Sequence, residues 1–332
     1  MLRIDHRVAD HPPGSDPEGI VLTFLVPREL AGLRLDRFIQ NRIPRLSRTR
    51  ANAIVRSCAF MADGRRRRPA ERVKDGEVVL LVRPHFEEPE TPLYFGVVYE
   101  DDDVLGVDKP SGLPMHPTAT YHRHTLTYLL REKYGDPTPH IAHRLDRETS
   151  GVVVCGKHID AERGLKRAFE DRRVKKTYQA IVRGVIEDDE GRIEVPLAHV
   201  REGLHVLMEV REDGYDSRTA YVVEERGPAH TLVTLHPETG RQHQLRVHLR
   251  EIGHPIVGDK LYGPEREQPF LDFIDTGMTP DLEARLGHDR QALHAHSVSV
   301  QHPIRDETLD ILAPLSPDLV KLWMRLRGSA GP

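Results

Sequence analysis

The sequence predicts an α+β fold divided into two domains of unequal size. Short apolar segments typical of strands alternate with amphipathic segments typical of helices along most of the 332 residues. Basic residues gather in one N-terminal stretch, and the segment 85–94 that follows it is rich in Pro and Glu without helical or strand periodicity. We therefore expect a tail at residues 1–19, a small domain at 20–84, a linker at 85–94 and a larger domain at 95–332.

The charge of the chain is unevenly distributed. Residues 24–84 contain 15 Lys and Arg against 6 Asp and Glu, a net charge of +9. Because the whole chain carries −4, the remainder carries −13. A basic segment of this kind is typical of contact with a nucleic acid, and the net charge of the whole chain conceals it.

Two helices are expected in the small domain. Leu35, Phe38 and Ile39 recur at helical spacing, and Pro44 should end this first helix. Ser47 is placed to cap a second helix, whose apolar face is expected to contain Ala51, Ile54, Val55 and Cys58.

The second helix also carries a polar stripe of Arg48, Asn52 and Arg56 at four-residue intervals. The stripe is equally consistent with a phosphate-binding surface and with a solvated helix face. Four consecutive arginines at 65–68 and an alternating strand at about 78–83 follow. A loop with this charge favours RNA as the ligand of the domain.

The larger domain is expected to begin with two strands around the acidic turn at residues 100–103. A long loop containing Asp146 should then enter the apolar strand VVVC at 152–155. The segment 264–291 has polar loop character, and we assign it no role. The other expected elements are a helix capped by Asp160, a strand at 176–182 closed by Gly184, a strand at 231–235, and a helix capped by Thr239 and stopped by Gly253.

Several classes of protein are not expected. No apolar run approaches the roughly 20 residues of a membrane helix, and the N-terminus lacks the apolar core of a signal peptide. Cys58 and Cys155 are the only cysteines, which is too few for a disulfide framework or a four-thiolate zinc site. We expect a cytoplasmic protein.

Metal and nucleotide sites are also not expected. The histidines show no H-E-x-x-H spacing, the DKPSG segment at 108–112 lacks the features of a phosphate-binding loop, and no G-x-S-x-G sequence occurs.

An arginine in the helix after Thr239 leads to a candidate site. Arg246 lies at the edge of the apolar face of that helix, where an unpaired guanidinium would be costly, and Asp146 is its natural partner. Alternatively, Asp146 pairs locally with Arg144 or Arg147, or caps the turn through Thr149 and Ser150. Spacing alone leaves both interpretations open.

Six motifs follow one another along the larger domain. They are DKPSGLPMHP at 108–117, HRLDRETSG at 143–151, KKTYQAIVRG at 175–184, TGRQHQLRVHL at 239–249, GHPIVGDKLYG at 253–263 and LHAHSVSVQHP at 293–303. In these motifs and their order, the larger domain resembles the RluA-type pseudouridine synthases. The resemblance implies a mixed, largely antiparallel sheet in two halves with an RNA-binding cleft between them.

The small domain contains RLDRF at 34–38, the P-x-L-S-R helix start at 44–48, and a closing V-x-x-G-E at 73–77. In these motifs and their order, it resembles the S4 RNA-binding domain. It departs from the family at Ser57, where glycine is usual, and at Asp63-Gly64, where Asn-Gly is usual.

The resemblance implies roles for individual residues. It makes Asp146 the catalytic aspartate, Tyr178 the tyrosine beneath the uracil and Arg246 the arginine paired with the aspartate. Arg144 resembles the residue that fills the gap left by an extruded nucleotide. We expect the remaining substrate-binding residues to be His143, Arg147, Thr149, Arg48, Asn52 and Arg56.

The expected function is isomerisation of specific uridines in structured RNA, with large-subunit ribosomal RNA as the expected target. We expect a monomer whose partner is RNA and which uses no metal or cofactor. The alternatives are a synthase acting on transfer RNA, a non-enzymatic ribosome assembly factor, and a hydrolase that would release free uracil and need a second acid.

Overall fold

The computed structural model describes residues 11–43, 46–84, 87–118, 120–204 and 206–328, and the chain divides into two compact units between Glu87 and Glu88. Pro44 and the first part of the expected tail lie outside the described residues. Within them, no helix is both long and apolar enough to cross a membrane.

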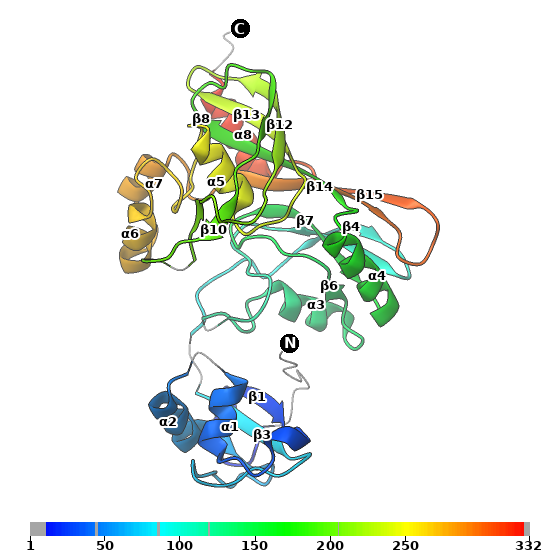
Figure 1. The fold of residues 1–332 in the computed structure, drawn as a ribbon, viewed down its shortest axis with the longest axis vertical. Helices are drawn as coiled ribbons and strands as arrows, with labels where there is room; N and C mark the ends of the chain where they lie inside the picture. The colour runs from blue at the N-terminus through cyan, green and yellow to red at the C-terminus, as the bar shows by residue number, and fades with distance from the viewer. Residues whose placement is uncertain (1–10, 44–45, 85–86, 119, 205, 329–332) are drawn as a thin grey trace. The chain divides into compact units, whose positions relative to one another are not determined.

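The smaller unit packs two helices on a three-stranded antiparallel sheet of order β1-β3-β2 (Figure 1). Its core joins Phe24 of the sheet to Phe38 and Val55 of the helices. Its elements are β1 Ile20–Leu25, a 3-10 turn Arg28–Leu30, α1 Leu35–Arg42, α2 Arg48–Cys58, β2 Ala59–Phe60 and β3 Val78–Arg83.

The start of α2 agrees with the sequence, whereas the burial pattern of β3 does not. The expected cap of α2 is confirmed, because the Ser47 hydroxyl accepts a hydrogen bond of 3.2 Å from the backbone N–H of Arg50. The expected alternation of β3 is wrong. Val79, Leu80, Leu81 and Val82 are all buried, which means that both faces of this strand are covered.

The larger unit is built on a mixed ten-stranded sheet of order β4-β5-β7-β14-β8-β13-β12-β9, with β6 added to β7 and β15 to β14. The β7–β14 pair is parallel, and the other pairs within the sheet are antiparallel, as expected. The strands are β4 Gly96–Glu100, β5 Val104–Lys109, β6 His140–Ile141, β7 Ser150–Gly156, β8 Lys175–Arg183, β9 Glu190–Ile193, β12 Thr219–Arg226, β13 His230–Pro237, β14 Leu293–Gln301 and β15 Thr308–Leu312, with β10 Leu197–His199 and β11 Met208–Val210 as a separate pair.

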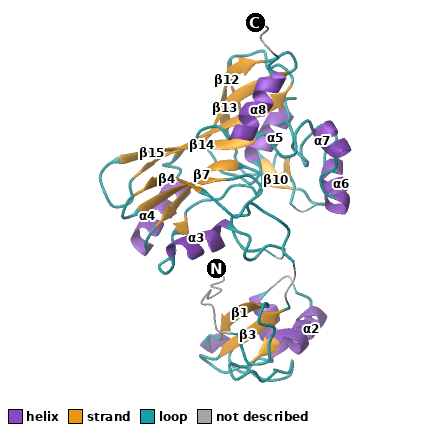
Figure 2. Cartoon of the chain, turned by 180° about the vertical axis from the view of Figure 1, so that it is seen from behind, coloured by secondary structure: helices purple, strands orange, loops and turns teal. Residues whose placement is uncertain are grey.

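Helices cover the two halves of this sheet separately. Figures 1 and 2 show α3 and α4 beside the half with β4, β6 and β7, and α5 and α8 beside the half with β12 and β13. One core cluster joins α5 and α8 to β8 and β13, while another packs α4 against β7, β14 and β15. The helices are α3 Leu126–Tyr134, α4 Ile159–Glu170, α5 Gln244–Glu251, α6 Gln268–Thr276, α7 Pro280–Leu286 and α8 Pro317–Leu326.

Three local expectations for the larger unit are wrong. The cap of α4 is His158, whose ring accepts from the N–H of Ala161, and Asp160 lies in the first turn. The cap of α5 is His243 rather than Thr239. The Thr239 hydroxyl donates to the side chain of Gln244 instead, at 2.7 Å. The segment expected to be polar loop contains the helices α6 and α7.

Candidate active site

A cavity of about 510 Å³ opens in the larger unit near the start of β7 and the N-terminus of α5. Asp146, Tyr178 and Arg246 all line it, so the fold brings together three residues that lie far apart in the sequence. Arg144, His143 and Thr149 also line this cavity. Its volume is in the range usual for small-molecule sites, which is large enough for one nucleotide.

Arg246 lies between two carboxylates. Its Nη1 donates to Asp146 Oδ2 at 2.9 Å. Its Nε and Nη2 bind Asp259 in a two-pronged contact at 2.7 and 2.8 Å. The side chains of Arg246 and Asp259 are 6% and 0% exposed, whereas Asp146 is 25% exposed. Arg246 therefore connects a fully buried acid to one that faces the cavity.

This arrangement keeps Asp146 ionised. Burial acts to raise the pKa of Asp146, but the charge and hydrogen bond of Arg246 outweigh it, and the pKa lies below its ordinary value of 3.8. The pKa of Asp259 is lowered for the same reason, with added hydrogen bonds from the backbone N–H groups of Leu261 and Tyr262. A carboxylate is thus available in the cavity at neutral pH.

Hydrogen bonds from the segment 109–112 fix the loop that carries Asp146. The Lys109 ammonium is fully buried and donates to the carbonyl of Arg147 at 3.0 Å, as well as to the carbonyls of Pro110 and Leu113. Ser111 Oγ donates to the carbonyl of Glu148 at 2.8 Å. Burial lowers the pKa of Lys109 to about 7. The DKPSG segment therefore supports the loop.

Strand pairing fixes the other end of this loop. Gly151 in β7 pairs with Ala295 of β14 and has φ +108°. A Cβ at Gly151 would lie 2.1 Å from the carbonyl oxygen of Ala295, so only glycine fits here. Thr149 is buried, and its hydroxyl accepts from Gln291 at 2.6 Å. The loop is therefore fixed by contacts with β5 and β14, two strands that pair with β7.

Tyr178 lies on β8 opposite Leu235 and Ala295, and its ring packs against two core clusters. Burial, and then the charge of Asp146, raise the pKa of Tyr178, so its hydroxyl stays protonated at neutral pH. Part of the side chain is accessible from the cavity. The arrangement presents an aromatic ring and a neutral hydroxyl beside a carboxylate.

Basic side chains surround the cavity. Arg144 is exposed at its edge, and Arg172, Lys176 and Arg241 also line it. Burial lowers the pKa of Lys176, and the charge of Arg172 adds to the effect. Cations that line the cavity are suited to the phosphate groups flanking an inserted base.

His143 and Arg147, both expected to bind substrate, make contacts within the protein that the sequence did not indicate. His143 stacks on Phe169 with ring centroids 4.5 Å apart and accepts from the backbone N–H of Val154 at 3.0 Å. Burial lowers its pKa to about 3, so it is neutral. Arg147 is not among the lining residues of this cavity; its guanidinium donates to the Tyr121 hydroxyl at 2.7 Å and lies 5.9 Å from the centre of the Phe273 ring.

In the smaller unit, the polar stripe on α2 is partly used within the fold. Arg48 and Arg56 are exposed. Asn52 donates to Asp36 at 3.2 Å and accepts from Arg56 Nε at 2.9 Å. The two arginines can face a ligand, whereas Asn52 holds α2 to the start of α1.

The arginine run at 65–68 is also divided by the fold. Arg65, Arg66 and Arg68 are exposed, but Arg67 is buried and forms ion pairs with Glu71 and Glu77 at 2.5 and 2.6 Å. Three of the four arginines can therefore face a ligand, whereas Arg67 is used within the fold.

Sequence reasoning missed several residues at the site. Asp259 is the principal partner of Arg246, and the Tyr262 ring lies 4.9 Å from the Arg246 guanidinium. Both belong to the motif at 253–263, but no spacing relates them to Arg246. His243, the cap of α5, lies with Nε2 3.8 Å from Asp146 Oδ2.

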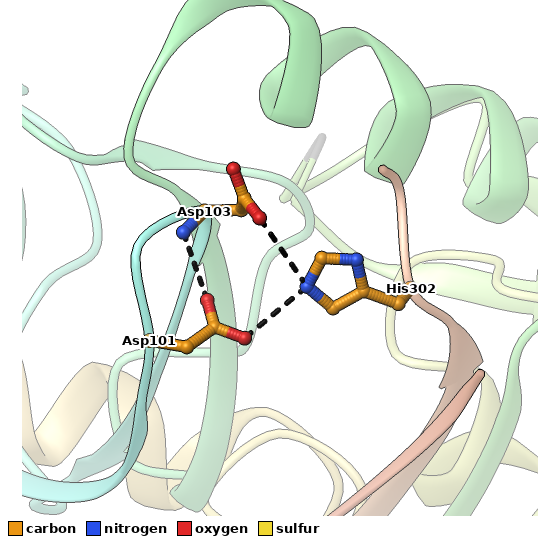
Figure 3. Close-up of side chains that lie close together, drawn as sticks. All are labelled: Asp101, Asp103 and His302. Carbon is orange, nitrogen blue, oxygen red and sulfur yellow. Dashed lines mark hydrogen bonds and ion pairs between the residues drawn. The ribbon is translucent and has the colours of Figure 1, made fainter. Parts of the chain in front are cut away.

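Among the described residues, one group of three side chains could in principle hold a metal ion: Asp101, Asp103 and His302 (Figure 3). His302 Nδ1 accepts from the backbone N–H groups of Ile304 and Arg305 at 3.1 and 2.9 Å. Its Nε2 lies 3.1 Å from Asp101 Oδ2 and 3.2 Å from Arg305 Nε, so both ring nitrogens already have protein partners and neither is free to bind a metal. Because Arg305 also pairs with Asp101, the group fits a set of ion pairs that joins the β4–β5 turn to the β14–β15 connection.

Comparison with known proteins agrees with this geometry. The profile of the family described as RNA pseudouridylate synthase matches residues 103–251. The chain is 37% identical over 314 residues to ribosomal large subunit pseudouridine synthase D of Xanthomonas campestris pv. campestris, covering 91% of this chain and 92% of that protein. It is 36% identical over 315 residues to the protein of the same name from Neisseria meningitidis serogroup A, covering 92% and 82%.

Two solved human structures resemble the fold. Human RNA pseudouridylate synthase domain containing 4 has a TM-score of 0.55 and 27% identity, covering 70% of this chain and 93% of that one. Human RNA pseudouridylate synthase domain containing 1 has a TM-score of 0.55 and 27% identity, covering 74% and 100%.

Proposed function

Because this chain belongs to the RNA pseudouridylate synthase family and is an RNA pseudouridine synthase, we propose that it modifies uridines of large-subunit ribosomal RNA. Relatives that carry ribosomal large subunit in their names match more than nine-tenths of the chain. Transfer RNA is the alternative substrate. The observation that carries the proposed chemistry is the carboxylate of Asp146, held ionised by Arg246 in a cavity of nucleotide size.

The reaction defines what each residue must do. The bond between N1 of uracil and C1′ of the ribose breaks, the base turns, and C5 bonds to C1′. C5 then loses its proton, and N1 takes up a proton. Asp146 lies where it can act as a carboxylate on the sugar or the base, and Arg246 keeps it charged. The Tyr178 ring offers a surface on which uracil can stack, with its hydroxyl near the position of C5.

The target uridine must leave the RNA stack before it can enter the cavity, at a cost of a few kcal/mol. Arg144 at the rim is placed to occupy the vacated space, and Arg172, Lys176 and Arg241 to bind the flanking phosphates. The reaction moves one bond and one proton within the substrate, so it consumes no cofactor.

The smaller unit supports a second RNA contact. We assign residues 20–84 as an S4-like RNA-binding domain after a tail at 1–19, joined by the linker 85–94 to a catalytic domain at 95–332. Arg48 and Arg56 are its proposed phosphate-binding residues. We also propose that the protein acts as a monomer in the cytoplasm.

Mapping of product positions tests this proposal. Purified protein is incubated with unmodified large-subunit ribosomal RNA and with unmodified transfer RNA, and pseudouridines are located by sequencing after chemical labelling. Pseudouridine at a few positions of the ribosomal RNA alone supports the proposal. Modification of transfer RNA alone would overturn the substrate assignment, and release of free uracil would indicate a hydrolase.

A further inference from the structure

His243 occupies a strained position next to the proposed catalytic carboxylate. It is the N-cap of α5 and has φ 54° and ψ 15°, in the left-handed region that residues other than glycine rarely adopt. Its side chain is 7% exposed and lines the cavity. Strained residues of this kind are concentrated at functional sites, where the surrounding structure holds them in place.

The hydrogen bonds of His243 define which ring nitrogen carries the proton. The Tyr262 hydroxyl accepts from the backbone N–H of Met208 at 2.8 Å and lies 2.7 Å from His243 Nδ1. Tyr262 is 1% exposed, so its hydroxyl proton needs an acceptor within the protein. Nδ1 is that acceptor, and the proton of the neutral imidazole is therefore on Nε2.

The Nε2–H group of His243 lies near the carboxylate of Asp146. Nε2 lies 3.8 Å from Asp146 Oδ2, which is beyond hydrogen-bond length. No hydrogen bond joins Nε2 to any other residue within the described part of the chain. A buried donor without a protein partner, lining a cavity beside the catalytic group, is placed to bind the substrate.

The charged surroundings keep this donor neutral. Burial, and then the charges of Arg246 and Arg144, lower the pKa of His243, whereas Asp146 and Asp259 raise it. The resulting pKa is about 4. At neutral pH the ring is a hydrogen-bond donor that adds no positive charge next to Arg246.

We propose that His243 is a further substrate-binding residue of the isomerisation, donating its Nε2–H to a carbonyl oxygen of the uracil. The inference rests on the proposed function of Asp146. Whether the carboxylate acts on the sugar or on the base, electrons pass into the uracil ring and negative charge collects on its carbonyl oxygens. A preorganised neutral donor stabilises that charge in the transition state. No bond to His243 forms or breaks, and its proton stays on Nε2.

Single-turnover kinetics test the proposal. His243→Ala should slow pseudouridine formation on the order of 100-fold, as expected for loss of one donor to a developing oxyanion, with RNA affinity nearly unchanged. His243→Gln keeps an N–H donor and should recover part of the rate. His199→Ala on β10, an exposed histidine, is the matched control. Parent rates in His243→Ala would overturn the proposal, as would a loss confined to RNA affinity and thermal stability with no rescue by glutamine.

The tautomer gives a readout that does not depend on activity. ¹⁵N NMR of the parent protein should show His243 neutral with the proton on Nε2, and Tyr262→Phe, which keeps the ring over Arg246, should increase the Nδ1–H form and slow the reaction. A parent ring protonated on Nδ1 would overturn the inference. If the parent protein converts no uridine in any RNA, the proposed function itself fails, and the NMR result still decides the geometry of His243.

Discussion

The exposed arginines on α2 of the smaller unit and the buried Arg246 of the larger unit act in different ways. Residues 1–87 contain 17 Lys and Arg against 11 Asp and Glu, whereas residues 88–332 contain 31 against 41. In the smaller unit, Arg48 and Arg56 are exposed on one helix. In the larger unit, Arg246 is buried between two carboxylates.

The difference separates two kinds of electrostatics. Exposed arginines act on a polyanion at long range, and salt screens them. A buried arginine acts on one neighbouring group, where it sets ionisation and geometry and is screened little. We therefore expect changes in the smaller unit to alter RNA affinity and its salt dependence, and changes around Arg246 to alter the chemical step.

The largest effect is expected for Asp146→Asn. The variant keeps the shape of the side chain but removes the carboxylate, so the single-turnover rate should fall on the order of 10⁴-fold. RNA affinity should stay nearly unchanged, because the rim arginines are intact. Asp160→Asn, an exposed acid on α4, serves as the control. Retention of a near-parent rate by Asp146→Asn would exclude Asp146 as the catalytic carboxylate.

The next effect concerns Arg246. Arg246→Ala leaves Asp259 buried without its partner, so the free energy of unfolding should fall by about 3–5 kcal/mol. Arg246→Lys keeps the charge but loses the two-pronged contact, and it should recover only part of the activity and stability. Denaturant unfolding measures the stability of the two variants, and single-turnover kinetics measure their activity.

Arg246→Ala should also change the pH dependence. In the parent the pKa of Asp146 lies below 3.8, so the stabilising effect of its ionised form is present above about pH 4 and is lost as the pH falls through the folded pKa. Without Arg246, burial dominates and raises that pKa, so the acid limb of the rate profile should move to higher pH. An unchanged acid limb in a folded variant would show that Arg246 does not control the ionisation of Asp146.

A smaller effect is expected in the smaller unit. The double variant Arg48→Ala/Arg56→Ala should weaken RNA binding and reduce the slope of log K against log salt by about 0.7–0.9 for each lost phosphate contact. The rate at saturating RNA should not change. Arg163→Ala, an arginine that is 73% exposed on α4, is the matched control. An unchanged slope in the double variant would assign the two arginines to a solvated helix face.

The smallest effect distinguishes two arginines that flank Asp146 in the sequence. Arg144→Ala should weaken binding of structured RNA, since its side chain is exposed at the cavity. Arg147→Ala removes contacts with Tyr121 and Phe273, so it should lower stability by about 0.5–2 kcal/mol and leave affinity nearly unchanged. Filter binding and thermal unfolding compare the two. The reverse order of effects on affinity would make Arg147 the RNA contact.

Much of the fold could be predicted from local patterns. The strands β4, β5, β7, β8 and β13 and the helices α1, α2 and α4 follow from apolar periodicity over short windows, as does the association of a basic segment with one domain. Local signals were weaker at helix starts. Ser47 caps α2 as expected, but His158 and His243 rather than Asp160 and Thr239 cap α4 and α5.

The pairing of charges could be predicted only in part. An arginine on the apolar face of a helix requires a buried acid, and this argument together with the family motifs led to Asp146 as the partner of Arg246. It did not reveal that Asp259 makes the stronger, two-pronged contact. Nor did four consecutive arginines indicate that Arg67 alone points inward.

Periodicity and charge composition are properties of neighbouring residues, so the sequence alone determined the α+β class, the two-part organisation and the candidate loop around Asp146. Contacts between residues 100 positions apart, such as Arg246 with Asp146, depend on how β7, β14 and β8 align and on how α5 packs against them. The proton position inferred for His243 likewise depends on the Tyr262 hydroxyl, which only the tertiary structure places 2.7 Å from Nδ1 of that ring.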